Sequence, residues 1–338
     1  MTRLQRFPIL LALLLALLAI SAGALERWRT DVRATDDVVA RSVQLTGVPA
    51  NATPLAPVVV PARLVPWGPT PNRLAASTPA PAIGGGAAIV LDEASGAVLY
   101  EKDAHARLPE ASLTKIMTAL LAIEHGNLDE QVDVQVDSRV MRGSTVMGLV
   151  PGERLTVDDL LYGLLLPSGN DAALAIGQHV SGSTEAFVAL MNKRAAELGL
   201  VDTHFANPHG LDAAGHYSSA YDLAVLTRTA MQLPEFRTIV NTRYKVVRGT
   251  LSTYQLGTLN PLYGRLAGVD GVKTGYTRTA RQTLVGSVMR DGHRVYAVVM
   301  RSEDRASDGV VLFNWTFDSY TWAGPTTVAS DSTTVPGT

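Results

Sequence analysis

The chain contains no cysteine, and this absence alone excludes several kinds of site. Disulfide bonds, thiolate metal sites, iron–sulfur clusters and a cysteine nucleophile all require a thiol. Any nucleophile must therefore be a Ser, Thr, Lys or carboxylate side chain, or a metal-bound water. Neither sign of charge is in excess, because 29 Lys and Arg residues face 31 Asp and Glu residues. Without a basic surplus, the sequence gives no indication of a nucleic-acid partner.

Charged residues are also few, at 18%, whereas hydrophobic residues make up 46% of the 338 residues. A chain of this length folds as one large domain or two small ones. The apolar content is sufficient for a substantial core.

Residues 1–26 are typical of a signal peptide or an N-terminal membrane anchor. Arg3 and Arg6 precede an apolar run over 7–25, which ends in the small residues Ala22-Gly23-Ala24. The run is about 19 residues long, close to the roughly 20 that span a bilayer, so cleavage and retention both stay open. In either case we expect the remainder of the chain outside the cytoplasm.

Two further segments have compositions that do not favour a packed core. Nine of the 18 prolines fall between Pro49 and Pro81, so we expect 27–83 to form an extended linker. Residues 323–338 are rich in Thr, Ser, Pro and Gly, and we expect a disordered tail there.

The segment between them, 84–322, is predicted to form one α+β domain. Its hydrophobic pattern changes from period two to helical spacing and back again. We expect strands at 87–91 and 97–101, helices at 111–124, 160–166, 171–180, 184–198 and 219–231, strands at 244–247, 271–273, 283–289 and 294–300, and a closing helix at 310–322. Strands at both ends with helices inserted between them predict one antiparallel sheet with helices packed on it.

A serine and a lysine stand together at the start of the helix expected over 111–124. Lys115 follows Ser112 by three residues, so both side chains lie on one helix face and the amine can reach the hydroxyl. The helix N-terminus favours an alkoxide-like Ser112. Lys115 can act as a base only when neutral, and work near pH 7 requires its pKa to fall by roughly 3, about 4 kcal/mol. Burial and a nearby cation both lower a lysine pKa.

Two other short motifs carry suitable chemistry. Ser168-Gly169-Asn170 lies in the break between two predicted helices, where a serine can relay a proton and an amide can orient the lysine or bind a carbonyl. Lys273-Thr274-Gly275 lies at the end of a predicted strand. It offers a cation and a hydroxyl for a carboxylate, and a position without a Cβ against which a substrate backbone can lie.

Each motif alone has an ordinary structural explanation: a helix cap with a solvated lysine, a helix–helix turn and a strand end. At average composition, S-x-x-K and S-x-N each occur about once by chance in such a chain, and K-T-G about 0.1 times. The order and placement of all three motifs favour a common site.

The segments around these motifs resemble the serine D-alanyl-D-alanine carboxypeptidases of the S11 peptidase family, the low-molecular-mass penicillin-binding proteins. The resemblance is carried by residues 111–120, 165–173, 207–211 and 269–277, and it covers roughly 84–320. It implies a DD-peptidase/β-lactamase-like fold and a location in the periplasm or at the surface of a bacterium. The implied substrate is the D-Ala-D-Ala end of a peptidoglycan stem peptide, with β-lactam antibiotics as covalent inhibitors and a role in peptidoglycan maturation and cell shape. No metal or organic cofactor is implied.

The resemblance also implies catalytic roles. Ser112 would attack the carbonyl between the two D-alanines, and Lys115 would accept its proton. Ser168 would pass a proton to the leaving D-alanine, and Asn170 would hold both the lysine and the substrate.

Substrate binding is implied for the strand. Lys273 and Thr274 would bind the terminal carboxylate, and Gly275 would admit the substrate backbone. The backbone N–H groups of Ser112 and Tyr276 would form an oxyanion hole.

The sequence departs from the family pattern at two places. Ala280-Arg281 stands where members usually have Ala-Gly, and Arg301-Ser302 stands where they usually have Gly-Gly. Both departures concern the rim of the site. The C-terminal β domain and amphipathic helix of larger members have no counterpart here, so we expect any membrane attachment to come from 7–25.

Other functions fit the sequence less well. A class A β-lactamase would need a deacylating Glu; Glu197 is the nearest candidate, but Val201 replaces the expected Asn. A silent wall-binding or penicillin-sensing protein would be expected to lose Ser112 or Lys115. A Ser-His-Asp hydrolase would need a G-x-S-x-G segment, which the chain lacks.

A metal hydrolase would have to draw its ligands from scattered residues. The candidates are His204, His209, His216 and Asp212, and no H-E-x-x-H helix is present. His209 is better explained as ordering a loop.

Overall fold

The structure is a computed structural model that describes residues 66–75, 77–141 and 143–322. The expected signal or anchor at 1–26, the greater part of the expected linker and the expected tail at 323–338 lie outside the described residues. No helix within the described ranges is both long and apolar enough to cross a bilayer.

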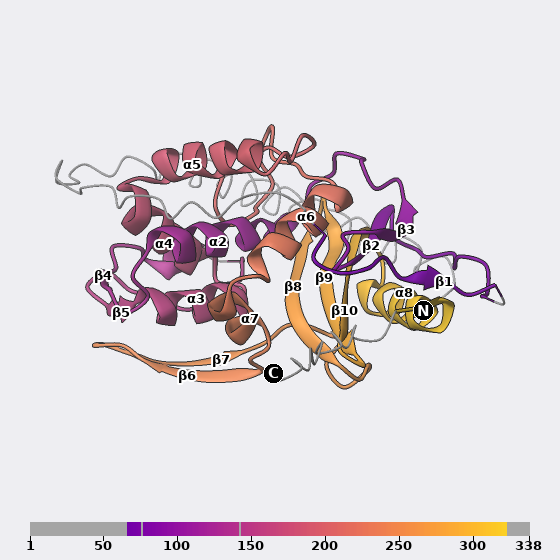
Figure 1. Cartoon of the computed structure of the whole chain (residues 1–338). Helices are drawn as coiled ribbons and strands as arrows, with labels where there is room; N and C mark the ends of the chain where they lie inside the picture. The colour runs from indigo at the N-terminus through magenta and orange to yellow at the C-terminus, as the bar shows by residue number, and fades with distance from the viewer. Residues whose placement is uncertain (1–65, 76, 142, 323–338) are drawn as a thin grey trace, which may run out of the picture. The chain divides into compact units, whose positions relative to one another are not determined.

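A five-stranded antiparallel sheet, in the order β3-β2-β10-β9-β8, forms the centre of the domain (Figure 1). Strands β2 (Ala87–Asp92) and β3 (Val98–Lys102) come from the N-terminal part, and β8 (Val269–Thr277), β9 (Arg281–Arg290) and β10 (His293–Ser302) from the C-terminal part. Pairing of β2 with β10 joins the two parts. The expected α+β fold is therefore confirmed, and β8 lies at one edge of the sheet.

Side chains of successive strand residues point to opposite faces of the sheet, and this divides the core into two layers. Ile89 and Val298 pack with the helical region, whereas Val90 and Val299 pack on the other face against helix α8 (Arg305–Ser319). Successive side chains of a strand point to opposite faces, so two buried faces need the continuous apolar runs that these strands have.

The inserted region is helical, as predicted. Its elements are the 3-10 turn η1 (Ala111–Thr114), α2 (Lys115–His125), α3 (Val157–Leu165), α4 (Asn170–Ser181), α5 (Thr184–Glu197) and α6 (Ala220–Ala230). A capping box begins α3, since the Thr156 side chain accepts the Asp159 N–H and the Asp159 side chain accepts the Thr156 N–H. Helices α3, α4 and α6 pack around α2, which is therefore buried over most of its surface.

Several short elements differ from the prediction. The closing helix starts at Arg305 instead of 310, because Asp304 caps it, and it ends at Ser319. The Lys-Thr-Gly segment lies inside β8 and not at its end. Elements not predicted are η2 (Ser138–Met141), β4 (Gln131–Asp133), β5 (Arg154–Thr156), α7 (Pro234–Val240) and β7 (Thr253–Gly257).

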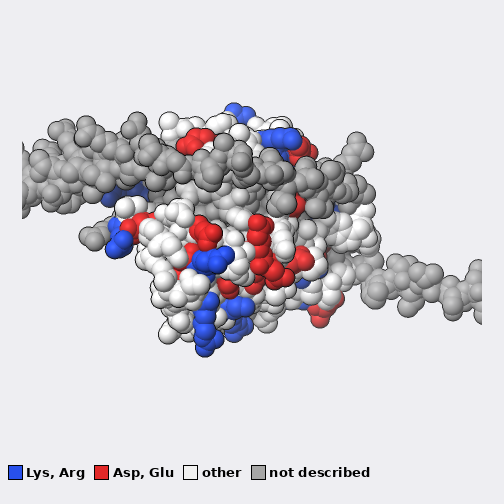
Figure 2. All heavy atoms as spheres, turned by 90° about the vertical axis from the view of Figure 1, so that its left-hand side faces the viewer, with Lys and Arg blue, Asp and Glu red and all other residues white. Residues whose placement is uncertain are grey.

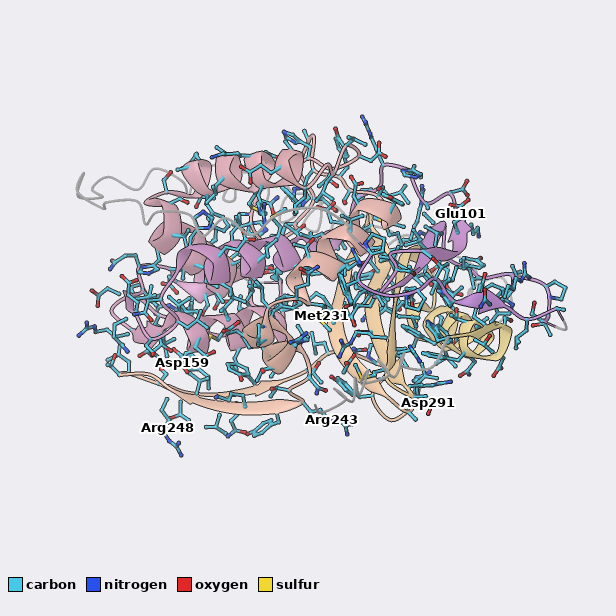
Figure 3. All side chains as sticks on the ribbon, viewed as in Figure 1. Glu101, Asp159, Met231, Arg243, Arg248 and Asp291 are labelled. Carbon is cyan, nitrogen blue, oxygen red and sulfur yellow. The ribbon has the colours of Figure 1, made fainter. Side chains whose placement is uncertain are left out.

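The strand expected at 244–247 does not join the sheet. As β6 (Tyr244–Arg248) it pairs with β7 in a separate hairpin, along which Figure 3 labels Arg243 and Arg248. The buried carboxylate of Glu153 ties this hairpin to the helical region: it accepts the Tyr254 hydroxyl and the Leu251 N–H, each at 2.8 Å.

The last part of the expected linker packs along the domain. Strand β1 (Asn72–Arg73) pairs with β11 (Tyr320–Thr321), and the Trp315 indole N–H donates to the Thr78 carbonyl. The Trp67 ring lies 4.0 Å from the Arg228 guanidinium. The segment is extended, as its prolines predict, but its aromatic ring and its backbone groups find partners on the domain, so residues 66–83 are not a free spacer.

Surface charge is mixed in sign where Figure 2 shows it. On this face, which is the left-hand side of Figure 1, basic side chains lie near acidic ones. Ion pairs join Arg139 to Asp137 at 2.7 Å and Arg154 to Asp133 at 2.8 Å. These exposed pairs contribute little to stability.

A buried Arg–Glu ion pair connects two of the helices. Arg194 on α5 meets Glu124 near the end of α2 through two contacts of 2.6 and 3.0 Å, and the two side chains are only 8% and 2% exposed. The pair therefore joins α5 to the central helix.

We predict that Arg194→Met destabilises the fold by about 3–5 kcal/mol, because it leaves the Glu124 carboxylate buried without its cation. The free energy of unfolding in urea measures this loss. Lys193→Met is the matched control, since the Lys193 side chain is 70% exposed in its pair with Glu197, and we expect a change within about 0.5 kcal/mol. Equal losses in the two variants would contradict the prediction.

Candidate active site

The amine of Lys115 lies at the centre of the site. Lys115 is fully buried at the start of α2. Its Nζ lies 2.9 Å from the Ser112 Oγ, 2.6 Å from the Asn170 Oδ1 and 2.6 Å from the carbonyl oxygen of His209. Residues from the 3-10 turn, from α4 and from a distant loop are thus brought to one nitrogen.

A neutral amine suits these three neighbours. The oxygens of Asn170 and His209 belong to carbonyl groups, which only accept, whereas the Ser112 hydroxyl can also donate. A neutral Lys115 has two N–H groups for the two carbonyl oxygens and one lone pair left for the hydroxyl hydrogen. In that arrangement the Ser112 proton already points at a base.

The surroundings of Lys115 favour the neutral form. Burial is the largest cause that lowers its pKa well below the ordinary 10.5, and the positive charge of Lys273 lowers it further. The Asp171 carboxylate acts in the opposite direction. Backbone N–H groups also bind the Asp171 carboxylate. It accepts hydrogen bonds from Met147, Gly148 and Leu149 at 2.8–2.9 Å.

The Ser168-Gly169-Asn170 segment occupies the break between α3 and α4, as predicted. Asn170 is the first residue of α4 and is 2% exposed. Ser168 has a left-handed backbone conformation with φ 67°, and its carbonyl accepts the Thr145 hydroxyl at 2.8 Å. Its own hydroxyl is buried and has no hydrogen-bond partner among the described residues. That hydroxyl remains available for a substrate.

Ser112 lies directly against strand β8 because Gly275 has no side chain. A Cβ on Gly275 would lie 2.8 Å from the Ser112 nitrogen and 2.9 Å from the Ala111 Cβ. Ala111 is left-handed, with φ 53°. Such conformations cost a non-glycine residue of the order of 1–3 kcal/mol and are typical of functional sites.

The lysine predicted as a cation on the strand is buried. Lys273 is 2% exposed, and its ammonium donates to the Thr274 carbonyl at 2.9 Å. Burial first, and then the nearby Arg305 guanidinium, lower the pKa of Lys273 to about 7. Tyr276 is 67% exposed, which places it at the rim.

Arg305 is a site residue that the sequence analysis missed. It is the first residue of α8, and its guanidinium donates to the Gly275 carbonyl at 2.7 Å. It therefore adds a second cation beside Lys273. The sequence held one signal for this residue. Asp304 is a typical helix N-cap residue, and recognising it would have placed Arg305 at the start of the last helix.

The loop that supplies the His209 carbonyl is held by its own polar groups. The Asn207 side chain accepts the Gly210 N–H at 2.7 Å and donates to the Leu211 carbonyl at 2.9 Å. The His209 Nδ1 accepts the Leu211 N–H at 3.2 Å, and desolvation of the ring is the largest cause that lowers its pKa to about 3. His209 thus orders the loop, as expected.

The histidines considered as metal ligands have separate partners. The His204 Nδ1 lies 2.6 Å from the Gly215 carbonyl, and the His216 Nε2 lies 3.0 Å from the Glu110 carboxylate. Within the described part of the chain, no three His, Cys, Asp or Glu side chains come together in a group that could hold a metal ion.

Comparison with known proteins matches residues 74–304 to the S11 peptidase family, described as D-alanyl-D-alanine carboxypeptidase. The chain is 38% identical over 242 residues to DacF of Bacillus subtilis, covering 69% of this chain and 62% of DacF. It is 36% identical to DacB2 of Mycobacterium tuberculosis, covering 74% of this chain and 88% of that protein. Both relatives are named D-alanyl-D-alanine carboxypeptidases.

This chain belongs to the S11 family. The solved DD-transpeptidase of Streptomyces K15 is similar to this S11 member with a TM-score of 0.68 and 34% identity, over 71% of this chain and 99% of that one. The expected DD-peptidase-like fold is therefore confirmed. The aligned part spans 62–65% of the first curated relatives, so this S11 member matches less than two thirds of their length.

The two departures from the family pattern keep an unusual backbone conformation. Arg281 has φ 58° and Arg301 has φ 54°, both in the left-handed region. Glycine adopts this region without steric cost, whereas a residue with a Cβ does not. Arg281 forms an ion pair with Glu303 across the adjoining strands. The rim therefore contains two left-handed positions that are not glycine.

The glutamate considered for a β-lactamase lies away from this site. Glu197 pairs with Arg194, which in turn pairs with Glu124 near the far end of α2. Nine helical residues separate Lys115 from Glu124, about 13 Å along the axis.

We predict that Lys273→Met raises the stability of the fold in a pH-dependent way. The pKa of Lys273 is about 7 in the folded protein and 10.5 in the unfolded chain. Below pH 7 both states are protonated and the folded state bears the full cost of the buried charge; as pH rises from 7 to 10.5 this cost is lost. The free energy of unfolding at pH 6 should therefore rise by about 2–4 kcal/mol in the variant.

Urea unfolding of both proteins at pH 6, 8 and 10 measures this effect. The stability difference should shrink steadily with increasing pH. A difference that is the same at all three pH values would show that the buried amine does not cause it.

Proposed function

We propose that this chain is a serine D-alanyl-D-alanine carboxypeptidase that removes the terminal D-alanine from peptidoglycan stem peptides. The observation that carries the proposal is the buried Lys115 amine, 2.9 Å from the Ser112 hydroxyl and bound by two carbonyl oxygens. A hydroxyl beside a neutral, buried amine is an activated nucleophile.

In the proposed acylation, the Ser112 Oγ attacks the carbonyl carbon between the two D-alanines, and its proton passes to the Lys115 Nζ. The negative charge that develops on the carbonyl oxygen is stabilised by the backbone N–H groups of Ser112 and Tyr276. The close approach of the Ser112 nitrogen to Gly275 supports this placement. Such donors are typically worth about 2.7–4 kcal/mol each.

The C–N bond then breaks, and the proton that Lys115 took from Ser112 passes through the Ser168 hydroxyl to the leaving D-alanine nitrogen, which leaves Lys115 neutral. The buried Ser168 hydroxyl has no competing partner among the described residues. Asn170 keeps Lys115 in place. Water attacks the carbonyl carbon of the acyl-Ser112 ester and gives a proton to Lys115. The ester C–O bond then breaks, the Ser112 oxygen takes this proton from Lys115, and the shortened peptide leaves. Lys273 and Arg305 attract the substrate carboxylate by their positive charges, and the Thr274 hydroxyl donates a hydrogen bond to it.

We propose a corresponding place in the cell. Residues 1–26 direct export or anchor the chain in the membrane, and the Pro-rich stretch before residue 66 links them to the catalytic domain in the periplasm or at the cell surface. There the enzyme acts in peptidoglycan maturation and cell-shape maintenance, and β-lactam antibiotics acylate the same serine.

We predict that Ser112→Ala abolishes both D-alanine release from a peptide ending in D-Ala-D-Ala and covalent labelling by a fluorescent penicillin, because the attacking oxygen is gone. The wild-type enzyme should release D-alanine and turn penicillin over slowly. Labelling of the variant at the wild-type level would contradict the role of Ser112, and rapid penicillin turnover by the wild type would indicate a β-lactamase instead. Mass spectrometry of digested muropeptides separates trimming of pentapeptides from cleavage of cross-links.

We also predict that Lys273→Met shifts the ascending limb of the pH–rate profile for penicillin labelling to higher pH. The rate rises as Lys115 loses its proton, and the Lys273 charge lowers the pKa of Lys115. Because the pKa of Lys273 is itself about 7, the coupling acts mainly below that pH. Lys193→Met is the control for loss of an exposed lysine. Superimposable profiles for Lys273→Met and the wild type would refute the coupling.

A further inference from the structure

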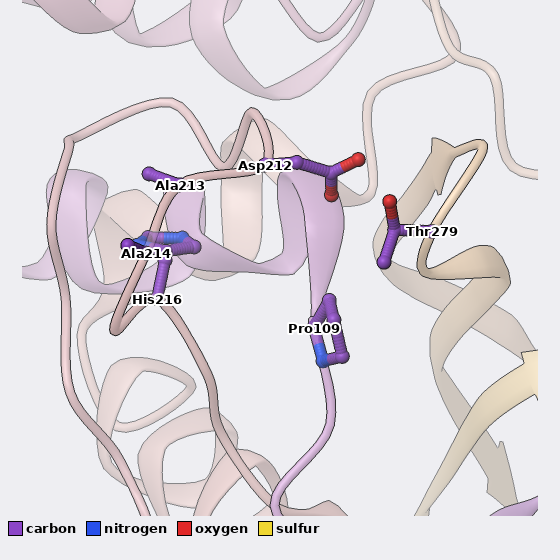
Figure 4. Close-up of a pocket in the computed structure, with 6 residues that line it drawn as sticks. All are labelled: Pro109, Asp212, Ala213, Ala214, His216 and Thr279. Carbon is purple, nitrogen blue, oxygen red and sulfur yellow. The ribbon is translucent and has the colours of Figure 1, made fainter.

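A pocket of about 300 Å³ lies beside the nucleophile turn, between the loop that carries His209 and the turn that follows β8. Pro109, Asp212, Ala213, Ala214, His216 and Thr279 line it (Figure 4). In Figure 4 the Asp212 carboxylate and the Thr279 hydroxyl extend toward each other from the two sides. None of the residues given a catalytic role above lines this pocket.

Asp212 connects the two walls of the active site. Its Oδ1 accepts the Thr277 hydroxyl at 2.7 Å, and Thr277 is the last residue of β8, two positions after Gly275. On its own loop, Asp212 follows His209, whose carbonyl contacts Lys115, by three residues. The Asp212 carboxylate is therefore held beside the reacting groups, at the end of β8 and four positions along the strand from Lys273.

The second oxygen of this carboxylate has no cation. Among the ion pairs of the described residues, none involves Asp212, and the residue is exposed. The other titratable lining residue is His216. Its Nδ1 accepts the Ala206 N–H at 2.8 Å and its Nε2 lies 3.0 Å from the Glu110 carboxylate, so both ring nitrogens already have partners. Arg278 directly precedes the lining residue Thr279, and its side chain is exposed.

Strand β8 thus has a charge order. Lys273, in the middle of the strand, and the Arg305 guanidinium are cationic, Ser112 lies opposite Gly275, and Asp212 places an anion at Thr277, where the strand ends. Four residues of strand separate Lys273 from Thr277, about 13 Å. An extended tripeptide spans about 10 Å. If the peptide carboxylate lies at Lys273, the residue before the two D-alanines reaches the pocket.

We propose that this pocket is the subsite for the residue that precedes D-Ala-D-Ala, and that Asp212 selects a side chain carrying a free amino group there. The inference rests on the proposed carboxypeptidase function. It assigns Asp212 to specificity: the residue touches the substrate side chain but takes no part in bond making. Thr277 keeps the carboxylate oriented, because its hydroxyl occupies one of the two oxygens.

Three peptides ending in D-Ala-D-Ala test the proposal. They differ only in the preceding residue: lysine, Nε-acetyl-lysine or norleucine. For the wild-type enzyme we expect kcat/KM for the lysine peptide to exceed that for the other two about fivefold, the size expected for a partly exposed ion pair. The preference should decrease with added salt, because salt screens such a pair.

Asp212→Asn removes the charge and keeps an oxygen that can accept from Thr277. The ratio of kcat/KM for the lysine peptide to that for the acetylated peptide should fall to about one in this variant. The matched control is Asp291→Asn, the same chemical change in the β9–β10 turn at the other end of β9, labelled in Figure 3; its ratio should equal that of the wild type.

The outcomes distinguish a failure of the Asp212 inference from a failure of the carboxypeptidase proposal. If the wild type releases D-alanine equally from all three peptides, the inference fails and the carboxypeptidase proposal stands. The same holds if Asp212→Asn slows all three peptides equally, since Asp212 would then only position the loop. If the wild type releases no D-alanine from any peptide, both proposals fail. The wild-type comparison needs no variant, so the test does not depend on how the variant folds.

Discussion

The amine of Lys115 has three oxygen neighbours and no exposure to water, and the arrangement of the domain around it follows from that constraint. A lysine at the start of a helix is buried only if the helix is covered on all sides, and α2 is covered by α3, α4 and α6. The sheet supplies the remaining wall and a second buried amine, that of Lys273. Two buried amines destabilise a fold, and a large apolar core on both faces of the sheet offsets that cost.

Strain is concentrated at the same place. Ala111 and Ser168 adopt left-handed conformations immediately beside the groups that face the substrate, and Gly275 allows two backbones to approach more closely than a side chain would permit. Each feature costs free energy locally, and the surrounding helices fix it. The backbone around Ser112 and Ser168 is therefore held in costly conformations by its surroundings, as is typical of functional sites.

The parts of the fold and site that could be predicted from the sequence are those fixed by local geometry. Ser112 and Lys115 meet because three residues form nearly one helical turn, and the period-two pattern of the segments that form β2, β9 and β10 predicted an antiparallel sheet with helices packed on it. The contacts of the His209 carbonyl, Arg305 and Asp212 could not be predicted, because they join segments distant in sequence and two of them use backbone atoms. The packing of 66–83 was missed for a similar reason: proline content predicts extension but does not show what the extended segment contacts.

The pairing of β1 with β11 has a consequence for how the domain can be attached to other sequences. It brings the two ends of the described domain together, and the Tyr320 hydroxyl binds the Leu99 carbonyl of β3 beside them. Strand β3 forms one border of the sheet and β8 forms the other, so the β1–β11 pair lies at the border away from the strand that carries Gly275 and Lys273. A label or tether joined close to β1 or β11 would therefore be attached away from Ser112.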